Sequence, residues 1–404
     1  MPPLLSGDPT VLSTKEGKRW YEALKSGDQQ QAFATAMEIV AALSKPDPPF
    51  NTDKIVRNAW RNYTALADKY NDPGRFSAII GYEYTTRGGF NLHRNVLFRG
   101  DASMANQMVP FSQFDSQNPE DLWKWMAGAE AQSGGNLLAL AHNGNMSNGI
   151  MFPVDRQYTG RRIDETYVTQ RALWEPLYEV TQIKGDGEAH PKLSTTDEFA
   201  DYGTWDKGIF GPEPKTADML PREYAREAYK RGLQYEEKLG ANPFKFGMVG
   251  STDSHTGLAT AEEENFFGKA TNAEPSPQRI NHAFTETDQG VFEGYELAAS
   301  GYAAVWAREN TREAIFDALA RKEAYGTTGP RIMVRFFGGW NYTRDDLNSR
   351  QPAFRGYEKG VPMGGDLTNA PSGKAPTFLV YALKDVYSGN LDRIQIIKGW
   401  MDEE

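Results

Sequence analysis

The feature that most constrains the fold is a repeated alternation of short apolar segments with longer amphipathic ones. The segment NLLALAHNG at 136–144 contains a continuous apolar run of the kind found in strands buried on both faces. Further apolar segments, at 76–85, 93–100, 173–182 and 244–255, are separated by segments with helical character. Short apolar strands that alternate with helices predict a mainly parallel sheet or a (β/α) barrel.

Local signals mark several helix ends. Asn118, followed by a proline, opens a helix that Gly134 ends, because proline suits the first helical turn and glycine the position after the last. Asn310 and Glu313 form a capping box, which predicts that a helix begins there.

The pattern changes near Arg331, after which strand-like segments follow one another without helices between them. We therefore expect two domains: a barrel over 1–330 and a small, partial antiparallel β extension over 331–404. The three strand-like segments are 332–340, 377–385 and 392–401.

Composition excludes several classes of function. The net charge is −10 and no block of basic residues occurs, which argues against nucleic-acid binding. The chain has no cysteine, so thiolate catalysis and Cys-ligated zinc are excluded. No apolar run approaches the ~20 residues of a membrane-spanning helix, and we expect no membrane partner. The oligomeric state and the compartment stay open, and a periplasmic or secreted parent protein is compatible with the sequence.

Polar residues capable of binding a metal lie at the ends of the expected strands. Glu83 ends one apolar segment, His93 begins the next, and His142 directly follows LLALA. Asp253 and His255 end the segment that starts at 244, and residues two apart on an extended chain face the same way. The carboxyl ends of barrel strands meet at one face, so we expect these side chains to converge. Imidazole and carboxylate are usual ligands of divalent metals.

Other interpretations compete with the metal site. A single histidine at a strand end is more often a structural residue, and Asp-x-His is a weak motif. Three such events at successive strand ends together favour a metal site. A hydrolytic triad within GSTDSHTG is excluded, because Ser251, Asp253 and His255 are neighbours on one segment, whereas triad members converge from separate places.

With GYEYT, LHRN, LAHNG and STDSH in this order, the chain resembles the PHP (polymerase and histidinol phosphatase) superfamily. It is most similar to a bacterial branch described only as a domain of unknown function. That branch also has segments like YEVTQIKG, AAVWARENTREAIFDAL and AYGTTGPRI, found here at 178–185, 303–319 and 324–332. The resemblance covers nearly the whole chain. It implies a distorted (β/α)7 TIM-like barrel with up to three divalent metals (Zn, Mn or Fe) and phosphoesterase chemistry.

The resemblance also implies a role for each residue. Glu83 is similar to the carboxylate that bridges two metals, and His93 and His142 to the remaining ligands of one of them. Asp253 is similar to a ligand of the other bridged metal, and His255 to a ligand of the third. A metal-bridging hydroxide would then attack the substrate, with Glu83, His142, Asp253 and His255 as the catalytic set.

One departure from the family pattern limits this expectation. PHP proteins begin with a His-x-His strand, and no histidine precedes His93 here. We therefore expect a fragment of a longer hydrolase, with the barrel incomplete at its N-terminus. Such a chain would bind at most one metal tightly and would be weakly active or inactive.

Two alternatives to a phosphoesterase remain open. An amidohydrolase-like C–N or C–O hydrolase ordinarily needs a carboxylated lysine at a strand end, and the sequence shows no evident candidate. A non-catalytic barrel that binds an anion or a sugar would not need a metal. In each case we expect a small ligand, anionic for a phosphoesterase, with Arg87, Arg94 and His190 as weaker candidates for substrate contact.

Overall fold

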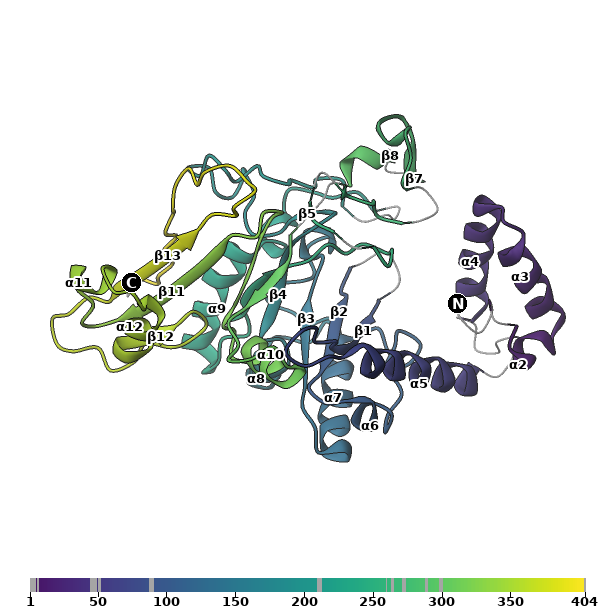
Figure 1. Ribbon diagram of the computed structural model, residues 1–404, viewed down its shortest axis with the longest axis horizontal. Coiled ribbons are helices and arrows are strands. Elements are labelled where there is room, and N and C mark those ends of the chain that lie inside the picture. The colour runs from purple at the N-terminus through teal and green to yellow at the C-terminus, as the bar shows by residue number, and fades with distance from the viewer. Residues whose placement is uncertain are drawn as a thin grey trace.

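The chain folds around a central mixed sheet with helices on both of its faces (Figure 1). The N-terminal helices lie at one end of the molecule, and a separate small sheet near the C-terminus lies at the opposite end (Figure 1). The computed structural model describes residues 5, 7–43, 49, 52–86, 91–208, 213–258, 260–262, 265–270, 274–287, 290–297 and 301–402.

The central sheet has six strands and mixed polarity. Neighbours run antiparallel from β1 to β2 and from β2 to β3, whereas β4 is parallel to both β3 and β6. A short β5 pairs antiparallel with the end of β4. The strands are β1 (Ile80–Tyr84), β2 (Arg94–Phe98), β3 (Leu137–Ala141), β4 (Leu177–Gln182), β5 (Gly185–Asp186) and β6 (Gly247–Gly250).

The expectation of a (β/α)7 barrel was wrong: the described strands form no closed barrel. A barrel of this type needs parallel neighbours throughout, and only two pairs in the central sheet are parallel. The connection between β1 and β2 is too short to hold a crossover helix, so the two strands pair antiparallel. β1 consequently ends the sheet with β2 as its partner, rather than closing a ring.

The described residues form three smaller sheets outside this one. They are the hairpin of β7 (Ala283–Thr287) and β8 (Gly290–Glu293), the pair of β9 (Ala303–Val305) and β10 (Ala324–Gly326), and the sheet of β11 (Met333–Gly339), β12 (Gly360–Pro362) and β13 (Thr377–Leu383). In the last of these, β11 is central and both of its neighbours are antiparallel to it. The segment 392–401 was expected to supply a strand but forms none, and β12 takes the third place in the sheet.

Of the two helix starts expected from capping signals, the one at Asn118 is confirmed, whereas the cap expected at Asn310 was wrong. Asn118 accepts a hydrogen bond from the backbone of α7, and Gly134 ends that helix in a left-handed conformation, with φ of 68°. The cap of α10 is Thr311 and not Asn310, whose side chain instead accepts a hydrogen bond from Ser77. None of the described helices has the length and apolar character needed to cross a membrane.

The bounds of the helices are as follows. The α-helices are α2 (Pro9–Leu12), α3 (Lys15–Lys25), α4 (Gln29–Leu43), α5 (Thr52–Tyr70), α6 (Ala102–Ala105), α7 (Pro119–Ser133), α8 (Glu165–Trp174), α9 (Ala225–Leu239), α10 (Arg312–Ala320), α11 (Arg344–Leu347) and α12 (Pro352–Lys359). Short 3-10 turns are η1 (Gly144–Met146), η2 (Leu220–Arg222), η4 (Arg279–Asn281) and η5 (Gly294–Glu296).

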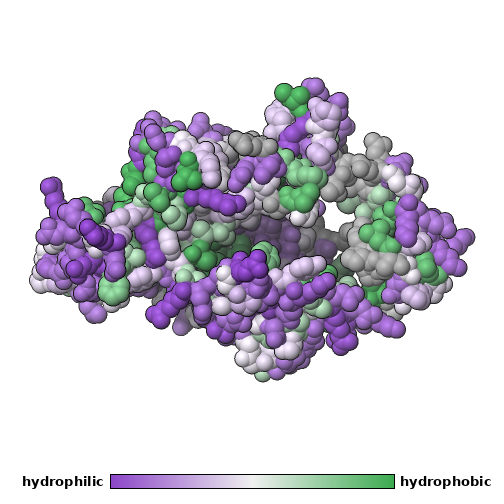
Figure 2. Space-filling model, in the orientation of Figure 1, coloured by the Kyte–Doolittle hydropathy of each residue, from purple (hydrophilic) through white to green (hydrophobic). Residues whose placement is uncertain are grey.

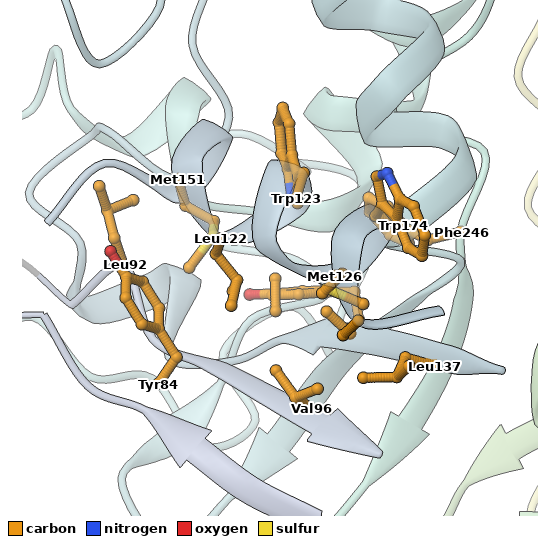
Figure 3. Packing of buried hydrophobic residues seen from close by; sticks show 14 of the residues in the cluster. Tyr84, Leu92, Val96, Leu122, Trp123, Met126, Leu137, Met151, Trp174 and Phe246 are labelled. Atoms are coloured by element: carbon orange, nitrogen blue, oxygen red, sulfur yellow. The ribbon is translucent and has the colours of Figure 1, made fainter. Parts of the chain in front are cut away.

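Alternate residues of the strands feed two separate cores. On one face, Leu122 and Met126 of α7 pack over Val96 and Leu137 of the sheet (Figure 3). On the other face, a smaller core joins the sheet to α10. Successive side chains of a strand point to opposite faces, so the buried length of β4 serves both cores at once.

Candidate metal centre

Three of the expected ligands converge at one end of the central sheet. Glu83 Oε1 lies 2.8 Å from His93 Nδ1 and 3.2 Å from His142 Nε2. One ligand atom from each residue can be chosen so that all of them lie within 4.8 Å of one another. In the described part of the chain, these residues form the one cluster of three or more possible metal ligands.

Strand pairing explains why residues distant in sequence meet here. Glu83 lies on β1, His93 immediately precedes β2, and His142 immediately follows β3. The three strands are neighbours, and the backbone N–H of His142 donates to the carbonyl of His93 at 3.3 Å. Asn143 then turns the chain away with φ of 59°, a left-handed conformation that asparagine tolerates better than most residues.

The charges of the cluster are strongly coupled. Burial opposes ionisation of Glu83, but hydrogen bonds from His142 and His93 outweigh it and hold the pKa of this carboxyl well below its usual range. Burial lowers the pKa of His93. Burial also acts to lower the pKa of His142, but the carboxylates of Glu179 and Glu83 raise it to about 9. The cluster is therefore an ionised carboxylate between a cationic His142 and a neutral His93.

This donor set suits a single divalent cation. Two imidazole nitrogens and one carboxylate oxygen match the three-ligand pattern of catalytic zinc sites, which keep one position for water or substrate. Glu83 is about one-third exposed, so the cluster is open to small molecules from solvent. The face drawn in Figure 2 is hollowed near its centre, in the region where β1 and β2 lie in Figure 1, and both hydrophilic and hydrophobic residues border the hollow.

Asp253 is not part of this cluster. Its carboxylate forms ion pairs with Lys184 and with Lys269, the latter at 2.8 Å between Nζ and Oδ2. Lys269 also donates to the backbone carbonyl of Asp253, whose left-handed φ of 49° is one that Asp adopts more readily than most residues. Two lysine side chains thus engage the carboxylate that the resemblance implied as a metal ligand.

His255 is likewise apart from the three ligands. Its side chain is 62% exposed, and its Nε2 lies 3.4 Å from Asp253 Oδ1. The backbone N–H of His255 donates to the carbonyl of Lys269 at 2.7 Å, which fixes the segment but leaves the imidazole at the surface.

The weaker candidates for substrate contact have other roles or are not described. Arg94 is 1% exposed and pairs with the buried Glu175 at 2.8 Å, so its guanidinium lies in the core. His190 is also buried, with Nε2 3.0 Å from Asp206 and Nδ1 accepting from the backbone of Lys192. Arg87 lies outside the described residues.

Three charged residues around the cluster were missed by sequence reasoning. Glu179 lies on β4, and its Oε1 is 3.6 Å from His142 Nδ1. A carboxylate flanked by apolar residues is costly to bury unless it is paired, and this signal in LYEVTQ could have drawn attention to it. Lys184 lies two residues after the end of β4. The amidohydrolase alternative requires a lysine near a strand end, but Lys184 pairs with Asp253 instead. Nothing local marks Lys269.

Comparison with known proteins places the chain in a family without assigning a function. The model of the family described as "Protein of unknown function (DUF3604)" matches residues 1–404. No curated protein and no solved structure matches the chain.

Proposed function

For this chain, which belongs to the DUF3604 family of proteins of unknown function, we propose a divalent-metal-dependent hydrolase that acts on a small anionic ester, with a phosphoester as the first choice. The observation that carries the proposal is the convergence of Glu83, His93 and His142. The resemblance of its motifs to the PHP superfamily supports the same chemistry.

The proposed centre holds one metal. Glu83 Oε1, His93 Nδ1 and His142 Nε2 would be its ligands, and the negative charge of Glu83 offsets part of the charge of the cation. A bound divalent metal supplies Lewis-acid chemistry, by which water is activated and an ester is polarised at neutral pH. Because Asp253 is engaged by two lysines, it supplies no ligand for a second metal in this arrangement.

An anionic substrate is favoured by the bound metal, which would supply positive charge to a chain that is acidic as a whole. Lys184 and Lys269 lie at the same end of the sheet, but both are buried and paired with Asp253. Their charges act on the cluster, since Lys184 contributes to the lowered pKa of His93. His255 presents an exposed imidazole next to Asp253 and can move a proton at Nε2.

Metal dependence and turnover test the proposal together. The protein is stripped with chelator, reloaded with Zn²⁺, Mn²⁺ or Fe²⁺, and assayed against chromogenic phosphomonoesters, phosphodiesters, sulfate esters and amides. We expect turnover of a phosphoester that chelator abolishes and that His142→Ala removes together with the metal. His282→Ala is the matched control, because His282 contacts Glu274 away from the cluster.

Two results would contradict the proposal. Turnover that survives both chelator and His142→Ala would exclude the metal mechanism. Saturable binding of phosphate without turnover of any ester, equally strong with and without metal, would favour the non-catalytic binding protein.

A further inference from the structure

Glu179 is a buried carboxylate with one oxygen left without a hydrogen-bond partner. The residue lies on β4, and its side chain is only 3% exposed. Oε2 accepts a hydrogen bond from Ser251 at the end of β6, whereas Oε1 has no hydrogen-bond donor. An unpaired buried carboxylate oxygen is costly, so its position requires an explanation.

The nearest cationic group to that oxygen is the imidazole of His142. Glu179 Oε1 lies 3.6 Å from His142 Nδ1, which is within reach of an ion pair but longer than a hydrogen bond. The opposite nitrogen of the same ring, Nε2, faces Glu83 at 3.2 Å. The ring therefore lies between two carboxylates, one in the ligand cluster and one behind it.

A second group competes for the same nitrogen. Asn143 Nδ2 lies 3.0 Å from His142 Nδ1. Gln182 donates to Asn143 Oδ1, and this contact turns the amide nitrogen of Asn143 toward the imidazole. An amide N–H can donate only to a ring nitrogen that carries no proton, so Asn143 favours the tautomer with its proton on Nε2. That tautomer cannot ligate a metal through Nε2.

We propose that Glu179 is a positioning residue that accepts a hydrogen bond from the Nδ1–H group of His142. This interaction keeps the Nε2 lone pair directed at Glu83 and His93. The proposal rests on the function proposed above, in which His142 Nε2 is a ligand. A metal-ligating histidine generally donates its other ring N–H to a carboxylate or carbonyl, which fixes the tautomer and the ring orientation. Glu179 is the carboxylate placed to do this, and Ser251 fixes its other oxygen.

The arrangement makes opposite predictions for the two neighbours of Nδ1. Loss of Glu179 removes the group that favours the ligating tautomer, whereas loss of the Asn143 side chain removes the group that opposes it. Asn143→Gly suits this test, because glycine accepts the left-handed backbone conformation at this position.

The proposal is tested by measuring how tightly the protein binds Zn²⁺ alone and Mn²⁺ alone. The affinities are obtained by competition with a chelating dye. We expect Glu179→Gln to weaken metal binding by about 10- to 100-fold, the usual effect of losing such a partner. Glu179→Met, which removes both oxygens, should weaken it at least as much. Asn143→Gly should bind as tightly as the parent protein or more tightly. Glu223→Gln is the matched control, because Glu223 is a buried carboxylate paired with Lys215 instead.

Imidazole nitrogen NMR gives a readout that a merely structural role would not change. In the metal-loaded parent protein, His142 should carry its proton on Nδ1, and in Glu179→Gln this signal should shift or broaden. The proposal is overturned if Glu179→Gln keeps parental affinity, or if Asn143→Gly and Glu223→Gln lose as much affinity as Glu179→Gln.

The two proposals can fail separately. If the parent protein binds no metal, the proposed function fails. The tautomer of His142 in the metal-free protein, measured above its pKa of about 9, still tests Glu179, because Glu179→Gln should then move the Nδ1 proton signal while Glu223→Gln leaves it unchanged. An unchanged signal in Glu179→Gln overturns the positioning role independently of metal binding.

Discussion

Lys269 Nζ lies 2.8 Å from Asp253 Oδ2, and Lys184 pairs with the same carboxylate oxygen. The side chains of both lysines and of the aspartate are nearly inaccessible to solvent. Burial lowers the pKa of Lys269 to about 8 and the pKa of Lys184 well below its usual value. The aspartate and the lysines therefore depend on one another, because each charge would be unfavourable in this position alone.

The first prediction concerns this ion-paired group. Lys184→Met should lower the free energy of unfolding by less than the about 3–5 kcal/mol that breaking an isolated buried pair costs, because Lys269 still pairs with Asp253. Asp253→Asn should cost more than Lys184→Met, because it leaves both lysines without their carboxylate, and urea unfolding of the four proteins in the cycle measures the coupling. Additive effects of the two substitutions would show that the residues do not act as a pair.

The second prediction separates the ligands from their neighbour. His93→Ala should weaken Zn²⁺ binding by more than the roughly 100-fold that losing a supporting partner costs, because a ligand itself is removed. His255→Ala should leave the metal content unchanged, since its exposed imidazole lies outside the cluster. Metal analysis after dialysis checks both variants. Loss of metal from His255→Ala would indicate that His255 is a metal ligand, as the PHP resemblance implied.

The third prediction concerns pH and a carboxyl group that is not one of the three ligands. Burial raises the pKa of Asp186 to about 7, far above the value of ~3.9 expected in the unfolded chain. A raised pKa contributes stability that is present below the unfolded value and is lost as pH rises through about 7. Between the unfolded pKa and pH 7, the free energy of unfolding falls by at most about 1.4 kcal/mol per pH unit.

Asp186→Asn should remove that dependence. Urea unfolding at pH 5 and pH 8 should show a smaller difference for Asp186→Asn than for the parent protein. Asp201 is exposed, so Asp201→Asn is the control and should show the same pH dependence as the parent protein. Equal pH dependence in Asp186→Asn and the parent would contradict the raised pKa.

The fourth prediction contrasts a buried arginine with a surface one. Arg94→Met should destabilise the protein, but by less than the about 3–5 kcal/mol of an isolated buried pair, because Glu175 would lose its closest partner and keep Arg171. Arg99→Met should cost no more than about 1 kcal/mol, since its pair with Asp317 is substantially exposed. Thermal unfolding compares the two. A change in KM for Arg94→Met without loss of stability would indicate that Arg94 contacts the substrate.

Parts of this structure could be predicted from the sequence because their causes are local. Asn118 and Gly134 delimit α7 through hydrogen bonds and a backbone conformation within a few residues. Glu83 and His142 could be proposed as ligands because each lies in or directly after an apolar strand. Asn310 was chosen as a cap because its residue type fits, but Thr311 is one residue nearer the helix and makes the bond.

Other parts were not predictable because they depend on distant segments. Apolar runs indicate strands but not their direction, so the antiparallel β1–β2–β3 arrangement was mistaken for part of a parallel barrel. The pairing of Asp253 with Lys184 and Lys269 joins segments that only the folded sheet brings together. A pattern of ligand types shows which residues can bind a metal, whereas the neighbouring cations decide which of them are free to do so.

The position of Glu83 on the outermost described strand of the central sheet has a dynamic consequence. β1 pairs with β2, while β4 is held from both sides. A cation bound by Glu83, His93 and His142 would connect β1 to the start of β2 and to the end of β3. It would therefore cross-link the edge strand to its neighbours. Amide hydrogen exchange in β1 would then report occupancy, slowing when the three ligands are engaged while β4 changes little.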